Sequence, residues 1–262
     1  MALINETALI TGATSGIGYE LAKLFAADKA RLVIVSRGEE MLWQVSKEFR
    51  DLGAPDVTII PKDLSIPGAA EDVYARTKEL GINISILVND AGVGEHGYFS
   101  EIDLEKEDTI INLNVVSLVH LTKLYLRDML NMDHGRILNL ASIASYQPTP
   151  TLAVYAASKA FVLSFTDALI HELQDTGITI TALIPGPADT DFFRKAHAEN
   201  TKAALDNPQD PAKVAKAGYE GLLKGKHHVT SKFSVQAQVA MSTAMPNEAV
   251  SSMASTYMKE KK

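Results

Sequence analysis

The chain has 262 residues and no cysteine, which excludes disulfides, thiol catalysis and thiolate metal sites. Its net charge of −7 and its lack of a basic stripe argue against a nucleic-acid partner. No charged apolar leader precedes the first predicted strand and no apolar run approaches about eighteen residues, so we expect a cytoplasmic protein with no membrane span.

The first predicted elements form a strand, a glycine turn and a helix. Glu6–Ile10 reads as a short buried strand, and the sequence TGATSGIG follows at Thr11–Gly18, before a helical pattern. In this arrangement Gly12 permits a tight turn, Gly16 lets backbone N–H groups approach a pyrophosphate, and Gly18 lets the helix pack closely on the sheet. The glycine spacing differs from G-x-G-x-x-G, and an ordinary glycine-rich connection remains the alternative.

The second predicted strand, Leu32–Ser36, ends without the acidic residue that NAD-preferring enzymes commonly use to bind the ribose 2′-hydroxyl. Arg37 stands there instead and could bind a 2′-phosphate, with the Ser36 hydroxyl as a neutral partner and the Thr14 or Ser15 hydroxyls close by. The sequence therefore favours NADP(H) as the cofactor, with NAD(H) possible. A solvated arginine at the start of a loop is the alternative interpretation.

The rest of the chain repeats the order strand, helix, strand. Further strand-like runs, mostly continuous in Val, Ile and Leu, lie at Val57–Pro61, Ile84–Asn89, Arg136–Ala141 and Thr179–Ile184. Helical patterns lie at about Glu39–Leu52, Ala69–Leu80, Leu104–Asn131 and Leu152–Asp175. Continuous apolar strands indicate that both faces of a sheet are covered, which predicts an α/β fold with a doubly wound, Rossmann-like parallel sheet. No linker, repeat or low-complexity tract divides the chain, so we expect one domain over residues 1–262 with a ligand cleft at the carboxyl ends of the strands.

Two residues in the last of these helical patterns have the spacing of an acid–base pair. Tyr155 and Lys159 are four residues apart and therefore share one face of a helix, and Ser142 lies thirteen positions before Tyr155 at a strand end. A nearby ammonium lowers the pKa of a phenol, so we expect Lys159 to bring Tyr155 into the range of proton transfer near neutral pH. Taken singly, Tyr-x-x-x-Lys also fits an ordinary helix surface, and a strand-end serine fits a simple turn.

Taken together, these motifs resemble the short-chain dehydrogenase/reductase family, and the likeness extends over roughly residues 7 to 190. In chain order, the residues that carry it are Thr11–Gly18, Asn89–Gly92, Asn114–Ser117, Ser142, Tyr155, Lys159 and Pro185-Gly186. Each motif is common when taken alone, whereas their conjunction is highly specific. One position departs from the family pattern, because Asp90 stands where the family has asparagine, and we expect a cost in stability rather than in turnover.

The resemblance implies where the cofactor binds. Asp63 would accept from the adenine amino group, with the Leu64 backbone beside it, and the backbone of Asn89–Gly92 would line a ribose. The segment Pro185–Thr190 would meet the nicotinamide carboxamide. The full set of expected cofactor contacts is Gly12, Thr14, Ser15, Gly16, Ile17, Gly18, Ser36, Arg37, Asp63, Leu64, Asn89, Ala91, Gly92, Tyr155, Lys159, Pro185, Gly186 and Thr190.

The resemblance also implies the reaction, a hydride transfer between NADP(H) and a small-molecule carbonyl or alcohol. Tyr155 would donate the proton, Lys159 would lower its pKa and bind the nicotinamide ribose, and Ser142 would polarise the substrate oxygen. Asn114 would support a water that relays protons from Lys159. Ketoacyl-thioester or steroid reduction is an alternative of the same class. A regulatory or structural protein that binds NADP without catalysis is the alternative of another class.

The C-terminal part carries fewer signals. The resemblance implies a substrate loop at about residues 190–225, and a homodimer or homotetramer formed through the helices that carry Asn114 and Tyr155. His227 and His228 are adjacent and would face opposite sides of a strand, so we expect no metal site. The end Lys259–Lys262 reads as a solvated terminus. Four methionines could border an apolar substrate pocket, although core packing or subunit contact fits them better: Met241, Met245, Met253 and Met258.

Overall fold

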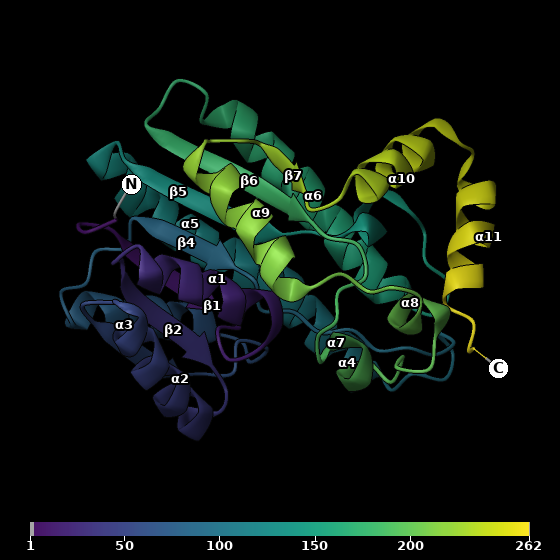
Figure 1. Cartoon of the computed structure of the whole chain (residues 1–262), viewed down its shortest axis with the longest axis horizontal. Helices are drawn as coiled ribbons and strands as arrows, with labels where there is room; N and C mark the ends of the chain where they lie inside the picture. The colour runs from purple at the N-terminus through teal and green to yellow at the C-terminus, as the bar shows by residue number, and fades with distance from the viewer. Residues whose placement is uncertain (1–2, 262) are drawn as a thin grey trace.

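The computed structural model describes residues 3–261 and contains a seven-stranded sheet in the order β3-β2-β1-β4-β5-β6-β7 (Figure 1). All neighbouring strands pair in parallel. This confirms the predicted doubly wound fold, in which the order reverses between β1 and β4. The strands are β1 Thr7–Thr11, β2 Arg31–Ser36, β3 Val57–Pro61, β4 Ile86–Asn89, β5 Gly135–Leu140, β6 Ile178–Ile184 and β7 His228–Thr230.

Strand β7 is the one strand in the described residues that the sequence did not predict. It has three residues, of which one is a histidine, so it presents no apolar run. Its pairing with β6 forms it, because Ala182, Leu183 and Ile184 lie opposite its three residues. A short edge strand of this kind depends on its neighbour more than on its own sequence.

Helices cover both faces of the sheet (Figure 1). One face packs against α1, α2 and α9, and the other against α3, α5 and α6. The helices are α1 Gly16–Ala27, α2 Glu39–Leu52, α3 Ala69–Glu79, α4 Leu104–Ile111, α5 Ser117–Met132, α6 Ala153–Glu172, α7 Phe192–Lys195, α8 Lys202–Leu205, α9 Pro211–Leu223, α10 Phe233–Ala244 and α11 Asn247–Tyr257. Two single turns complete the set, a π-helical turn at Asn112–Val116 and a 3₁₀ turn at Ile143–Tyr146.

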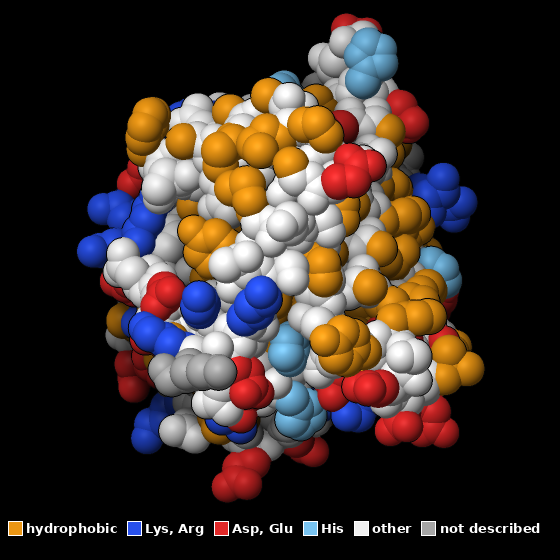
Figure 2. Space-filling view, turned by 90° about the vertical axis from the view of Figure 1, so that its right-hand side faces the viewer, with side chains coloured by type: hydrophobic (Ala, Val, Ile, Leu, Met, Phe, Trp, Pro, Cys, Tyr) orange, Lys and Arg blue, Asp and Glu red, His pale blue; other side chains and the backbone are white. Residues whose placement is uncertain are grey.

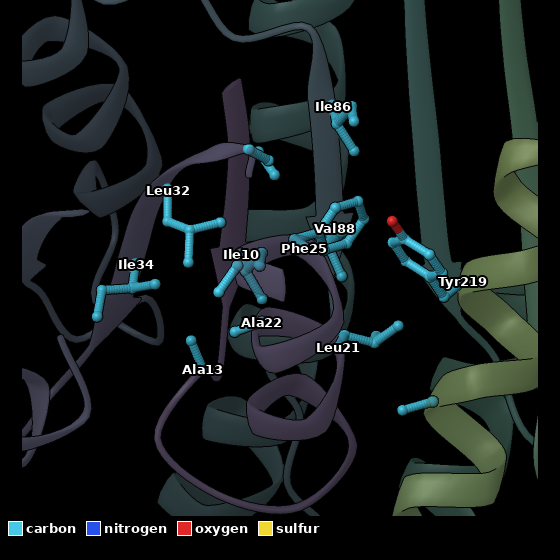
Figure 3. Packing of buried hydrophobic residues seen from close by; sticks show 14 of the residues in the cluster. Ile10, Ala13, Leu21, Ala22, Phe25, Leu32, Ile34, Ile86, Val88 and Tyr219 are labelled. Carbon is cyan, nitrogen blue, oxygen red and sulfur yellow. The ribbon is translucent and has the colours of Figure 1, made fainter. Parts of the chain in front are cut away.

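Alternation along the strands divides the core into two layers. Ile10 and Ile34 face the layer of α1, whereas Leu9 and Val33 face the layer of α5. In Figure 3, Tyr219 of α9 and Phe25 of α1 point toward one another, and their rings meet edge to face with centroids 4.9 Å apart. Each fully buried side chain of this size contributes about 1.5–3 kcal/mol relative to exposure, so these two layers hold the sheet and its strand ends in place.

Two helical stretches have the length and mean hydropathy of a membrane span, Leu104–Met132 and Ala153–Glu172. Both contact the sheet, α5 through β4 and β5 and α6 through β5 and β6. In their most apolar windows, 44% and 39% of the residues are buried inside the protein. Their apolar character is therefore used at least partly in the core of the described fold.

Residues 191–209, together with α10 and α11, form a cover over one end of the sheet (Figure 1). Within the expected substrate region at residues 190–225, α7 and α8 lie in this cover. Helix α9 instead packs against α1 in the helix layer on the sheet. The cover has a small core of its own, made of Leu152, Ala196, Ala198, Ala203 and Met258. Helices α10 and α11 stand at the same end (Figure 1).

Residues 259–261 are exposed, as expected for a solvated C-terminus, but backbone hydrogen bonds also hold them in place. Lys202 N–H donates to the Lys259 carbonyl at 3.0 Å, and Lys261 N–H donates to the Asn200 carbonyl at 2.9 Å. These backbone bonds pair the end of the chain with the segment before α8. Lys262 lies outside the described residues.

Candidate active site

A single large cavity of about 510 Å³ opens at the carboxyl ends of the strands. Most of the expected cofactor residues line it: Gly12, Thr14, Ser15, Gly16, Ile17, Ser36, Arg37, Asp63, Leu64, Ala91, Gly92, Tyr155, Pro185, Gly186 and Thr190. Ser142 lines it as well, whereas Gly18, Asn89, Asn114 and Lys159 lie behind its wall. The structure thus brings residues from six strand ends to one space, as a parallel sheet requires.

The glycine turn has the geometry of an anion site. Gly12 and Gly16 adopt φ values of +73° and +60°, which side chains other than glycine rarely tolerate. A Cβ at Gly16 would lie 3.2 Å from the Thr190 side chain, so glycine allows the turn and the segment after β6 to approach one another closely. Helix α1 begins at Gly16, and the N–H groups of its first turn have no intrahelical acceptors. These residues fit a pyrophosphate.

The end of β2 presents hydroxyl and guanidinium groups to the cavity. The hydroxyls of Thr14 and Ser36 lie 3.1 Å apart, and exposed Arg37 lines the cavity beside them. Lys62, which sequence reasoning missed, lines the same part and forms an ion pair with Asp72 at 3.0 Å. The one signal for Lys62 in the sequence is that it directly precedes Asp63, an expected cofactor contact.

Ser142 is placed by the turn that follows β5. Its hydroxyl oxygen accepts from the Ala144 N–H at 3.1 Å and caps the turn Ile143–Tyr146. Ser145 in that turn donates to the Lys159 carbonyl at 2.7 Å, which fixes the turn against α6. The Ser142 hydroxyl and the phenol of Tyr155 both line the cavity, and the interaction with Ser142 opposes the rise that burial causes in the pKa of Tyr155.

Tyr155 and Lys159 share one side of α6, and the ammonium lies 5.9 Å from the centre of the phenol ring. The Lys159 ammonium donates to the Leu140 carbonyl at 2.7 Å. Burial raises the pKa of Tyr155 to about 12, and the interaction with Ser142 opposes that shift. Burial lowers the pKa of Lys159 to about 8, opposed by the charge of Asp90.

These values correct one expectation. The sequence predicted that Lys159 lowers the pKa of Tyr155, but burial dominates and the ammonium is directed to a carbonyl rather than to the phenol. Desolvation penalises the phenolate more than the interaction with Ser142 stabilises it. Tyr155 is therefore held in its protonated form at neutral pH, which is the form that donates.

Asn114 lies in the π-helical turn that interrupts the single helix predicted over Leu104–Asn131. Its amide donates to the Val93 carbonyl at 2.9 Å and to the Ser158 hydroxyl at 3.0 Å. Its oxygen accepts from the Val93 N–H at 3.0 Å. A Cβ at Gly92 would lie 3.3 Å from Asn114 Oδ1 and 3.4 Å from Lys159 Nζ, so both side chains end behind this glycine.

The structure places Asn89 away from the cavity, although it was among the expected cofactor contacts. Its amide donates to the Thr122 hydroxyl at 3.0 Å and to Asn139 Oδ1 at 2.9 Å. Asn139 in turn donates to the Thr166 hydroxyl at 2.9 Å. This buried chain of polar groups ties β4 and β5 to α5 and α6, because buried amides require partners. The Asn89 side chain therefore serves the sheet.

Asp90 departs from the family pattern and lies buried against the glycine turn. A Cβ at Gly12 would lie 3.0 Å from its Oδ2 atom, and a Cβ at Gly18 would overlap it. Burial raises the pKa of Asp90 to about 7, opposed by the charge of Lys159 and by the Gly18 N–H. A carboxyl group thus lies against the glycine turn and interacts electrostatically with Lys159.

Sequence reasoning also missed two aromatic residues of the cover. The ring of Phe192 lies 4.9 Å from that of Tyr155, centre to centre, and Phe193 packs against Phe192. A Cβ at Gly94 would approach the Phe192 ring to 3.0 Å, so glycine makes room for this contact. The pair lies in a polar stretch without periodicity, which left no signal beyond the two adjacent phenylalanines.

The family model described as short chain dehydrogenase matches residues 6–201. The chain belongs to this family. This short-chain dehydrogenase is 31% identical over 234 residues to an uncharacterized oxidoreductase of Staphylococcus saprophyticus, covering 89% of this chain and 98% of the relative. It is 38% identical over 188 residues to a very-long-chain 3-oxoacyl-CoA reductase of Anas platyrhynchos, covering 70% of this chain and 59% of the relative.

Among solved structures, a short-chain dehydrogenase from Sphingobium yanoikuyae in complex with NADPH matches with a TM-score of 0.83 and 28% identity. The match covers 90% of this short-chain dehydrogenase and 91% of that chain. Family and geometry agree on the class of reaction. The protein is an oxidoreductase that transfers hydride between a nicotinamide dinucleotide and a carbonyl or alcohol substrate.

Proposed function

We propose that the protein is an NADP(H)-dependent carbonyl reductase in which Tyr155 is the general acid. The observation that carries this proposal is that Ser142 and Tyr155 line the same cavity and that Ser142 lies close enough to the phenol to act on its pKa. Two hydroxyls in one cavity wall can both contact one carbonyl oxygen. Because burial keeps the phenol protonated, Tyr155 is ready to donate when negative charge develops on that oxygen.

In the proposed mechanism each residue acts at a stated atom. The bound dinucleotide supplies hydride from the C4 position of its nicotinamide ring. Ser142 holds the substrate oxygen, and Tyr155 transfers its hydroxyl proton to it. Lys159 and Asn114 both end behind Gly92 rather than in the cavity lining, and from there they can replace a proton lost by Tyr155. Phe192 packs on the phenol ring and limits the access of water.

The preference for NADP(H) over NAD(H) is supported by the end of β2. Arg37 supplies a charge and several donors at the cavity, and the Ser36 and Thr14 hydroxyls lie beside it. Such a set suits a 2′-phosphate, which accepts charge-assisted hydrogen bonds. Between Leu32 and Gly38 the chain has no carboxylate that would bind a 2′-hydroxyl and repel a phosphate.

A narrower substrate class, oxoacyl compounds with long chains, is favoured by a second observation. A separate narrow gap of about 10 Å³ lies between α10 and α11 beside the cavity, and its wall contains Met241, Met245 and Met253. Methionine side chains are flexible and adapt to apolar groups of irregular shape, so this wall can move to admit an acyl chain. The name of the Anas platyrhynchos relative, a very-long-chain 3-oxoacyl-CoA reductase, points the same way. Short ketones and steroids are the compounds with which long-chain oxoacyl compounds should be compared.

Figure 2 shows the face of the molecule at the α10–α11 end, with hydrophobic side chains gathered on it. Phe233 is 84% exposed and Tyr257 is 51% exposed on these two helices.

The expected homodimer or homotetramer stays a prediction, as does the cytoplasmic location. Support for the oligomer comes from α6, where Phe161 is 44% exposed and stacks on Phe165.

The decisive experiment follows NADPH absorbance with a panel of aldehydes, diketones, steroids and 3-oxoacyl thioesters. We expect turnover with at least one class, and Tyr155→Phe to lower kcat roughly a thousandfold while NADPH still binds. Tyr98→Phe is the matched control, because Tyr98 is 69% exposed and lies outside the cavity. Binding of NADPH with no turnover of any compound would favour the regulatory or structural alternative.

A further inference from the structure

Gln209 is a buried polar side chain that the proposed mechanism does not use. It lies two residues before α9 and is 4% exposed. Its N–H donates to the Pro187 carbonyl at 2.8 Å, and its carbonyl accepts from the Asp189 N–H at 2.8 Å. The backbone of Gln209 is thus fixed to the segment that follows β6.

The side-chain amide of Gln209 is satisfied on one side only. The Ser231 hydroxyl donates to its oxygen, Oε1. Its nitrogen, Nε2, is buried and has no hydrogen-bond partner within residues 3–261. A buried donor without a partner is costly, and native proteins retain few of them. An unused donor in the wall of a binding cavity therefore indicates a ligand acceptor.

Gln209 is part of the cavity wall, and its Nε2 atom lies just behind the wall surface, against Gly186. A Cβ at Gly186 would lie 2.8 Å from Nε2 and 3.0 Å from the Val235 side chain, so glycine at 186 leaves the space that the amide borders. Gly186, Gln209 and Val235 all line the cavity. The Ile143 N–H, next to Ser142, donates to the Pro185 carbonyl at 2.9 Å. Gln209 thus lies against Gly186, and the preceding Pro185 is bonded to the neighbour of Ser142, the serine expected to hold the substrate oxygen.

The two ends of the segment 185–190 have different neighbours. Thr190, at the far end, contacts the glycine turn at Gly16. Nε2 of Gln209 lies at Gly186 together with the side chain of Val235 of α10, which is not among the expected cofactor contacts. We therefore assign the acceptor for Nε2 to the substrate.

We propose that Gln209 determines specificity by donating a hydrogen bond from Nε2 to a second oxygen of the substrate. This role of Gln209 rests on the proposed function, and it narrows the substrate to carbonyl compounds that carry a further ester, thioester or keto oxygen close to the reacting carbonyl. A simple ketone leaves the buried donor unpaired, and sites built to hydrogen-bond a substrate group discriminate strongly against analogues without it.

The test compares ethyl acetoacetate with 2-heptanone, which has a chain of equal length without the ester oxygens. Gln209→Glu keeps the shape and the acceptor for Ser231 but removes the donor, and Gln209→Met removes both polar atoms without adding charge. We expect both variants to lower kcat/KM for ethyl acetoacetate roughly ten- to a hundredfold and to change that for 2-heptanone less than about twofold. Gln236→Glu, an exposed position on α10, is the matched control.

A binding measurement separates this inference from the proposed reaction. Both compounds are titrated in the presence of NADP⁺, where no reduction takes place, and NADPH affinity is measured by fluorescence as a check on the fold. Selective binding of ethyl acetoacetate that both variants abolish supports the role of Gln209 even if nothing is turned over. Equal losses for the two compounds, an absence of selectivity in the native chain, or weaker NADPH binding in both variants would overturn it.

Discussion

The two halves of the cavity are built in different ways. The cofactor half is formed by the ends of β1 to β4, which are held by parallel backbone pairing and by two packed layers of helices. The substrate half is formed by residues 191–209 and by α10 and α11, which stand outside those layers (Figure 1). Its own core contains mainly alanines, with Leu152 and Met258 as the larger members.

This difference explains how one family fold can serve many substrates. A dinucleotide needs donors at fixed strand and helix ends, which a parallel sheet provides with little freedom. A substrate contacts whatever side chains the cover presents, and those can change without disturbing the strands. We therefore expect substitutions in one half to affect one ligand and to leave the other unchanged.

The largest effect is expected at the cofactor half. Replacing Arg37 by alanine removes the charge beside the 2′-phosphate and should raise the KM for NADPH roughly ten- to a hundredfold, with a much smaller change for NADH. Steady-state kinetics with both cofactors measure this. Arg31→Ala, at the exposed opposite end of β2, is the control. Equal changes for NADPH and NADH would remove the assignment to NADP(H).

A smaller effect is expected in the substrate half. Met245→Trp places a larger side chain in the gap between α10 and α11 and should lower kcat/KM for a twelve-carbon 3-oxoacyl ester roughly tenfold. The four-carbon ester should be unaffected, and the Kd of NADPH should stay the same. Met41→Trp on α2, where the side chain is 46% exposed, controls for the substitution itself. A loss independent of chain length would mean that the gap does not hold the acyl chain.

The smallest effect tests the boundary between the halves, where Asp90 meets Lys159. The negative charge of Asp90 opposes the burial that lowers the pKa of Lys159 to about 8. Removing that charge in Asp90→Asn leaves burial unopposed, so the pKa of Lys159 should fall further. If protonated Lys159 supports the reaction, the alkaline limb of the pH profile of kcat/KM should move to lower pH.

Below about pH 7 the Asp90 carboxyl is itself protonated, so the variant and the native chain should behave alike there. Asp108→Asn, on the exposed side of α4, serves as the comparison. An alkaline limb that stays in place would show that Asp90 has only a structural role against Gly12 and Gly18.

Reasoning from the sequence worked where function depends on local spacing. The six apolar strands and the glycine turn were predicted because period and turn residues are local properties of the chain. The shared side of Tyr155 and Lys159 followed from helical geometry alone. Asn114 lies within the long helical pattern at Leu104–Asn131, where a buried amide requires partners, and a π-helical turn forms there.

Reasoning from the sequence did not work where the outcome depends on what surrounds a group. The sequence predicted a lowered pKa for Tyr155, whereas burial raises it, because desolvation depends on atoms contributed by Phe192 and other distant residues. For Asn89 the sequence implied a backbone contact with a ribose, whereas only the structure shows which partners on α5 and β5 bind its amide.

The sequence by itself determined the class of fold, the glycine turn and the shared helix face of Tyr155 and Lys159, since each is written in a few neighbouring residues. Only the tertiary structure decided the shape of the substrate half, the pairing of the C-terminal residues with the segment before α8, and the position of the Gln209 amide. These features join residues far apart in the chain, from Ser142 to Ser231 and Met258, and no local period records such contacts.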